Sequence, residues 1–172
     1  MAHAKKNKQE LIDRSSLKKL KFFRGHDGQD GFSAELYIDG AFICEVLDDA
    51  WGGGVNYQIG DYAKLKAIES EYDLTSPSLF KGEDPIDLGF DTIIDALVNQ
   101  HKIKKDAKKG IVFKEPNGWS IWGFGVTIPT AIKRWGKEPI KRDVQKQYDK
   151  YIQSGKEILN KAYLKEELGI RV

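Results

Sequence analysis

The dipeptide Asp39-Gly40 lies between two runs of alternating apolar and polar residues, and it constrains the fold of this 172-residue chain more than any other feature. Asp-Gly in a two-residue connection is typical of a type I′ turn, in which both central residues need a positive φ. The pattern therefore predicts a β-hairpin with one strand over residues 32–39 and the next over residues 41–48.

The register of this hairpin follows from the turn, because a two-residue connection fixes which residues face each other. It pairs Leu36 with Ile43 and Ala34 with Glu45. One face of the hairpin would then be apolar except for Glu45, and we expect that face to cover the core. The apolar members of this face are Phe32, Ala34, Leu36, Ile38, Ala41, Ile43 and Leu47.

The rest of the chain adds strands first and helices later. We expect strands at 18–24, 54–59, 111–114 and 119–124, and helices at 86–101, 127–135, 139–154 and 160–168. Asp84-Pro85 would begin the first of these helices, residues 102–110 would form a basic turn, and Asn160 would cap the last helix. This order indicates an α+β fold, with an antiparallel sheet (an N-terminal meander plus a later hairpin) packed against helices and a helical C-terminal third.

The length of the chain fits one domain. We expect a flexible N-terminal tail and lead-in over residues 1–16 and a single α+β domain over residues 17–172. Cys44 is the only cysteine, so no internal disulfide is possible, which favours a reducing compartment. There is no signal-peptide pattern, and no apolar run approaches the roughly 20 residues of a membrane span, so we expect a cytoplasmic protein with no membrane partner.

Two polar loops, at residues 26–31 and 48–54, would meet at one edge of the predicted sheet. Carboxylates with a histidine suit a hard divalent cation, although Asp-Gly pairs are also ordinary turn residues. We expect no cofactor, with a divalent metal as the one possibility. The run Gly52–Gly54 is not followed by the Lys-Ser/Thr of a phosphate loop. The candidate ligand-binding rim consists of His26, Asp27, Asp30, Asp48, Asp49 and Trp51.

Charge is divided unevenly along the chain. Residues 1–100 hold 11 Lys/Arg and 18 Asp/Glu, a net charge of −7, and residues 101–172 hold 17 and 8, a net charge of +9. Lys and Arg neutralise phosphates and interleaved aromatic residues stack on bases, so the basic part has the composition of a nucleic-acid-binding surface; a solvated helical face would have the same charges. The candidate contacts are Lys105, Lys108, Lys109, Lys133, Arg134, Lys141 and Arg142.

Several segments resemble a loosely defined group of small phage and mobile-element proteins that have no established activity. The similar segments are residues 31–40, Asp48-Asp49 with the following glycines, 94–97, 111–114 and 157–160. They span most of the chain. The resemblance implies an accessory role in a phage or mobile element and says nothing about chemistry.

Three functions follow from these patterns. The favoured one is a phage or mobile-element accessory protein that acts by binding, with a host protein (or a phage protein) as the partner that it inhibits or modulates. The first alternative is a nucleic-acid-binding protein that uses the basic C-terminal half. The second is a metal-dependent enzyme with its site at His26, Asp27, Asp48 and Asp49. Binding is favoured over catalysis because only the rim would supply acid, base or metal-binding groups.

Overall fold

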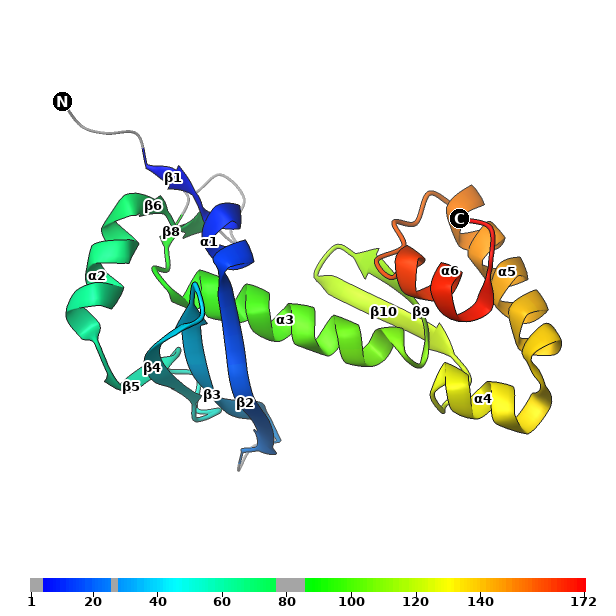
Figure 1. The fold of residues 1–172 in the computed structure, drawn as a ribbon, viewed down its shortest axis with the longest axis horizontal. Helices are drawn as coiled ribbons and strands as arrows, with labels where there is room; N and C mark the ends of the chain where they lie inside the picture. Colours follow the sequence, from blue (N-terminus) through cyan, green and yellow to red (C-terminus); the bar gives the residue numbers. More distant parts are fainter. Residues whose placement is uncertain (1–4, 26–27, 77–85) are drawn as a thin grey trace. The chain divides into compact units, whose positions relative to one another are not determined.

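The computed structural model describes residues 5–25, 28–76 and 86–172, and it divides the chain into two compact units, Met1–Val98 and Asn99–Val172 (Figure 1). Each unit has a hydrophobic cluster of its own. The prediction of a single folding domain over residues 17–172 stays a prediction, which the unfolding experiments below test. Within the described residues, no helix is long and apolar enough to cross a membrane.

The first unit is built on a four-stranded antiparallel sheet in the order β2-β3-β4-β5. Two short strand pairs accompany it: β1 with β6, in parallel, and β7 with β8, antiparallel. The elements of this unit, with α3 crossing its C-terminal boundary, are β1 (Lys6–Asn7), α1 (Lys8–Arg14), β2 (Ser15–Arg24), β3 (Asp30–Ile38), β4 (Ala41–Asp48), β5 (Asn56–Gly60), α2 (Tyr62–Glu71), β6 (Tyr72–Asp73), β7 (Thr75–Ser76), β8 (Ile86–Asp87) and α3 (Asp91–Ala107).

The β3–β4 hairpin confirms the predicted turn and corrects the predicted register. Asp39 and Gly40 have φ values of 51° and 77°, as a type I′ turn requires. Beyond the turn, Tyr37 pairs with Phe42, but Leu36 pairs with Cys44 rather than with Ile43. Ile43 is therefore the extra residue of a β-bulge.

This bulge explains why Glu45 seemed to interrupt an apolar face. Past Ile43 the alternation of β4 is shifted by one residue, so Cys44 and Val46 are buried while Glu45 lies opposite Glu35 and only half-buried. The register also shifts once in the β2–β3 pairing and once in the β4–β5 pairing. Such shifts increase the local twist of the strands in which they occur.

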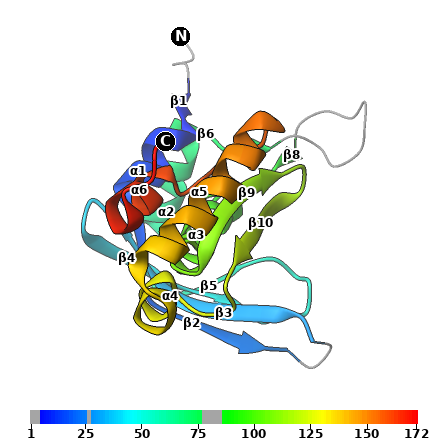
Figure 2. The ribbon, with the colours of Figure 1, turned by 90° about the vertical axis from the view of Figure 1, so that its right-hand side faces the viewer.

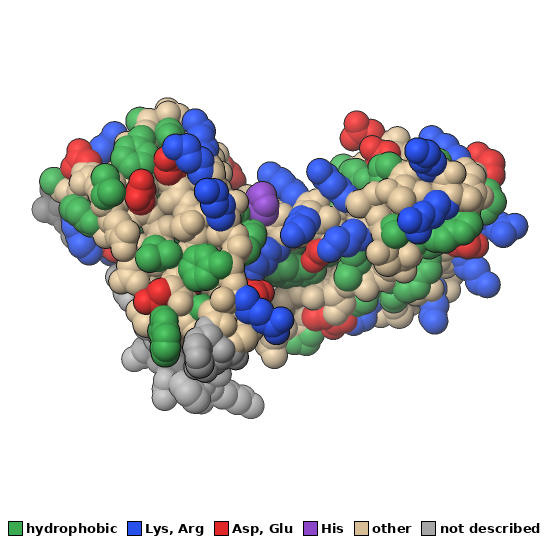
Figure 3. Space-filling view, turned by 90° about the horizontal axis from the view of Figure 1, so that it is seen from below, with side chains coloured by type: hydrophobic (Ala, Val, Ile, Leu, Met, Phe, Trp, Pro, Cys, Tyr) green, Lys and Arg blue, Asp and Glu red, His purple; other side chains and the backbone are tan. Residues whose placement is uncertain are grey.

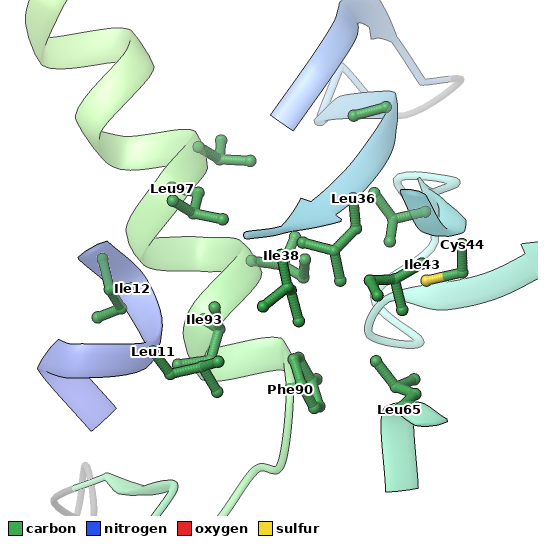
Figure 4. Packing of buried hydrophobic residues seen from close by; sticks show 14 of the residues in the cluster. Leu11, Ile12, Leu36, Ile38, Ile43, Cys44, Leu65, Phe90, Ile93 and Leu97 are labelled. Atoms are coloured by element: carbon green, nitrogen blue, oxygen red, sulfur yellow. The ribbon is translucent and has the colours of Figure 1, made fainter. Parts of the chain in front are cut away.

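The helix α3 packs on the inner face of the sheet, as predicted. Figure 4 shows Ile93 and Leu97 of α3 pointing toward Leu36 and Ile38 of β3, with Leu11 of α1 beside them. The predicted bounds of 86–101 were wrong at both ends. Ile86–Asp87 is β8, and the helix begins only at Asp91. It continues to Ala107, because the basic stretch that follows His101, predicted as a turn, contains no helix breaker before Gly110.

The described part of the predicted N-terminal lead-in packs into the first unit. Leu11 of α1 is fully buried, and the side chain of Asn7 accepts a hydrogen bond from the backbone N–H of Gln9 as the helix cap. Arg14 donates to both carboxylate oxygens of Asp39, at 3.0 and 2.5 Å, and these bonds hold the pKa of Asp39 below its ordinary value. The end of α1 is thus tied to the hairpin turn.

The second unit contains the later hairpin and the helical part of the chain. Its elements are β9 (Gly110–Glu115), β10 (Gly118–Gly123), α4 (Ile128–Trp135), α5 (Lys137–Gln153) and α6 (Lys161–Leu168). Ile111 and Phe113 of the hairpin share a core with Val144 and Tyr148 of α5, and Figure 2 shows α5 beside β9. The observed architecture confirms the predicted α+β class with an N-terminal antiparallel meander, a later hairpin and a helical C-terminal third.

Asn160 does not cap α6 with its side chain, contrary to the prediction. The residue is buried and its side-chain oxygen accepts from the backbone N–H of Val112 at 3.0 Å. Its amide nitrogen donates to the backbone oxygens of Gly110, at 2.8 Å, and Ala107, at 3.3 Å. One side chain therefore joins the end of α3, the start of β9 and the start of α6.

Candidate functional site

The described part of the predicted rim is a pair of loop turns. Asp48 accepts a hydrogen bond from the backbone N–H of Ala50 at 2.9 Å, and Asp49 accepts from Trp51 at 3.0 Å. Both carboxylates thus serve the local backbone, as Asp does in ordinary turns. Asp30 is exposed at the start of β3, and Trp51 is 72% exposed.

Metal binding at this rim stays a prediction. His26 and Asp27 lie outside the described residues. Among the residues that are described, no three His, Cys, Asp or Glu side chains are arranged to bind a metal ion. The loops do meet: a Cβ on Gly31 would come within 2.6 Å of the backbone oxygen of Asp48, so the predicted proximity of the two loops is correct.

The predicted basic residues all lie in the second unit, on three of its helices or directly after them. The boundary between the units, at Val98, coincides with the change in charge, because Asn99 and Gln100 are neutral and the second unit therefore has the net charge of +9 counted above. Figure 3 shows Lys and Arg side chains over much of the visible surface of this unit. The charge of the chain is thus divided between two structural units and not only between two halves of the sequence.

A groove on α5 brings two of these residues together with two further cations. We call it the α5 groove; it has a volume of about 570 Å³. Lys141 and Arg142 were predicted as nucleic-acid contacts, and Lys146 and Arg171 complete the set of cations. The other lining residues are Glu138, Gln145, Asp149 and Gly169. Four cations against two carboxylates leave the groove positive, so it suits an anionic ligand.

Arg171 reaches the groove through hydrogen bonds that sequence reasoning missed. The side-chain oxygen of Gln145 accepts from the backbone N–H of Arg171 at 2.7 Å, and its nitrogen donates to the Arg171 carbonyl at 3.1 Å. Gly169 turns the chain after α6 with a φ of 64°, in the left-handed region that glycine adopts readily. The only signal in the sequence was the Gly169 stop after the last predicted helix.

Lys109, one of the three predicted cations at the end of α3, is less available than its position in the sequence suggested. Lys109 lies 3.0 Å from a carboxylate oxygen of Asp106, and Trp119 donates from its indole nitrogen to the same carboxylate at 3.1 Å. Burial raises the pKa of Asp106, but these two hydrogen bonds and the positive charges of Lys109 and Lys105 together hold that pKa below its ordinary value. Lys105 and Lys108 are exposed, and no ion pair is found for them within the described ranges.

The remaining predicted pair, Lys133 and Arg134, ends α4 beside an exposed tryptophan. Both cations are exposed and lie in the last turn of the helix, where positive charge also favours the helix dipole. Trp135 follows them and is 51% exposed. Its ring rests on Phe124, with 6.2 Å between the ring centroids. This group is separate in sequence from the lining of the α5 groove but belongs to the same unit.

Comparison with known proteins gives no match: no family model, curated protein or solved structure is significantly similar to the chain. The resemblance to phage and mobile-element proteins therefore stays a prediction.

Proposed function

We propose that the second unit binds nucleic acid, with its lysine and arginine side chains contacting phosphates. The observation that supports this proposal is the coincidence of the charge boundary with the unit boundary. A separate compact unit with a net charge of +9 offers phosphates a surface that its own acidic residues neutralise only in part.

Within that unit, the α5 groove and the end of α4 supply the strongest candidates for phosphate contacts. Arg142 has its nearest acidic partner, Asp143, at 3.7 Å, and both side chains are well exposed, so their attraction is weak. Lys133, Arg134 and Lys141 have no ion pair among the described residues. These side chains are available to contact phosphates and so displace the counterions that surround the nucleic acid.

The test is the salt dependence of binding. In a chain with Lys133, Arg134, Lys141 and Arg142 all changed to Gln, we expect about tenfold weaker binding to a fluorescent DNA duplex at moderate salt. The slope of log affinity against log salt should become shallower by up to about 3.6, because each phosphate contact contributes about 0.9 to that slope. Fluorescence anisotropy at several salt concentrations measures both quantities.

A matched control removes the same charge from the first unit. Lys5, Lys21, Arg24 and Lys64 are exposed residues of that unit, and changing them to Gln lowers the net charge by the same four units. Binding and its salt slope should then stay close to those of the unmodified protein. Equal losses in the two variants, or no binding of duplex or single strand by the unmodified protein, would refute the proposal.

A protein partner is the second candidate function, and the outer face of the β2–β5 sheet supports it. Phe42 is 42% exposed and packs edge-on against Tyr37, with 5.7 Å between ring centroids. The Nζ atom of Lys18 lies 3.9 Å from the centroid of the Tyr37 ring. Exposed aromatic rings among mixed charges are typical of protein interfaces. The resemblance to phage proteins makes a host protein the expected partner.

We expect Phe42→Ala to reduce retention of such a partner at least about tenfold, as loss of an interface aromatic does. Retention of host-lysate proteins on the immobilised chain, at raised salt, measures this. Ile59→Ala is the matched control, because Ile59 is 72% exposed in the neighbouring β5 strand and should be neutral. Equal retention by all three chains would argue against this face as an interface.

A further inference from the structure

The end of α4 and the start of α5 form an exposed corner with a tryptophan among cations. We call the residues Lys133, Arg134, Trp135 and Lys137 the Trp135 corner. All four are exposed, and the chain turns between the two helices at Gly136, whose φ is 86°. Glu138 is the one acidic residue in the exposed run 133–139, so the corner keeps a positive balance.

The ring of Trp135 is supported by an aromatic neighbour. It contacts Phe124, and Phe124 in turn packs against Trp122, with centroid distances of 6.2 and 5.4 Å. Trp122 and Phe124 pack against the core of the second unit. The tryptophan is therefore positioned by an aromatic row anchored in the core, while about half of its surface is open to solvent.

Resting on the proposed nucleic-acid function, we infer that the Trp135 corner is a base-stacking site for single-stranded nucleic acid. An aromatic face takes the face of a base, and neighbouring cations take the phosphates on either side of it. A base in a duplex is already stacked on both faces, so a protruding tryptophan selects for unpaired strands. Lys133, Arg134 and Lys137 all lie within two residues of Trp135 in the sequence and give this exposed corner the positive charge that phosphates require.

Trp51 shows why the cations matter to this inference. It is more exposed than Trp135, at 72% against 51%. Its loop, however, contains Asp48 and Asp49 and no cation, so it would repel a phosphate backbone. Trp51 therefore offers a matched control: an exposed tryptophan with carboxylates, and no cations, in its loop.

The experiment compares Trp135→Ala with Trp51→Ala on three fluorescent probes: oligothymidine, oligouridine and a DNA duplex. Stacking contributes enough for Trp135→Ala to weaken single-strand binding by about tenfold. Duplex binding should change less than about twofold, because phosphate contacts remain. Trp135→Phe should keep most of the single-strand affinity, and binding of oligothymidine should quench tryptophan emission in the unmodified protein but less in Trp135→Ala. The two single-stranded probes show whether DNA or RNA is preferred.

The outcomes separate this inference from the proposed function. If the unmodified protein binds the duplex and Trp135→Ala leaves both single strands unaffected, the stacking site is refuted and the proposed function stands. Equal losses on single strands and duplex would also refute it, because they indicate a general change in the surface; circular dichroism and melting show whether the fold is retained. If the unmodified protein binds no nucleic acid, both proposals are refuted.

Discussion

Leu36→Ala should lower the free energy of unfolding of the first unit by about 2–5 kcal/mol, the range for a buried leucine that leaves a cavity. Leu36 is fully buried near the C-terminal end of β3, and its side chain lies between the sheet and α3 (Figure 4). The rigid sheet on one side and the helix on the other leave little freedom to close the cavity. Leu88→Ala is the matched control, since Leu88 is 49% exposed and should cost well under half as much.

Cys44 provides the measurement for this unit. Its side chain is 1% exposed, and burial raises the pKa of the thiol from 9.0 to about 11, so the folded protein holds it as an unreactive thiol. Labelling of Cys44 by a thiol reagent across a urea gradient therefore reports opening of the first unit. If Leu36→Ala and Leu88→Ala shift the labelling midpoint equally, the placement of Leu36 in the core is wrong.

Asn160→Ala should destabilise the second unit by roughly 2–5 kcal/mol, because each buried polar group left without a partner costs about 1–3 kcal/mol. The Asn160 side chain makes one hydrogen bond to the backbone N–H of Val112 and one each to the carbonyls of Gly110 and Ala107. The variant would remove all three. Asn117→Ala is the matched control, because Asn117 is an exposed turn residue of the same unit. Urea unfolding followed by tryptophan fluorescence measures the change, since three of the four tryptophans lie in this unit. If Asn160→Ala lowers the free energy of unfolding as little as Asn117→Ala does, the proposed stabilising role of the Asn160 side chain is wrong.

The two probes together test the predicted single domain. If Cys44 labelling and tryptophan fluorescence give coincident transitions in the unmodified protein, the two units unfold as one cooperative domain. Separate midpoints, with Asn160→Ala shifting only the fluorescence transition, would show that the units unfold independently. Each core would then be stabilised by its own contacts alone.

Local signals in the sequence predicted the elements of this fold but not all of their pairings. The Asp39-Gly40 turn is fixed by its own backbone preference, so the prediction was correct. The bulge at Ile43 depends on which side chains fit against α3, and Glu45 on an apolar face was its only sign. The start of α3 was placed too early because the helical spacing of apolar residues extends into β8.

The candidate sites differ in the same way. Lys141 and Arg142 were recognisable as cations outside the buried face of a helix, because Ile140 and Val144 mark that face. Asn160 was interpreted as a cap because the position before a helix favours asparagine. Its three partners lie about 50 residues away, in a segment that no local pattern connects to it. Hydrogen bonds of this kind depend on tertiary structure and leave no periodic trace.

The bulge at Ile43 also bears on how this chain would vary among its relatives. Removing Ile43 would leave Tyr37 opposite Phe42 and Leu36 opposite Cys44, so every other pair of the hairpin would keep its partner. A one-residue deletion is therefore tolerable here in terms of register, whereas the same deletion elsewhere in β4 would turn buried side chains outward. An alignment of related chains is expected to place a single-residue gap at this position, accompanied by a larger side chain at a neighbouring core position that fills the volume of the lost isoleucine.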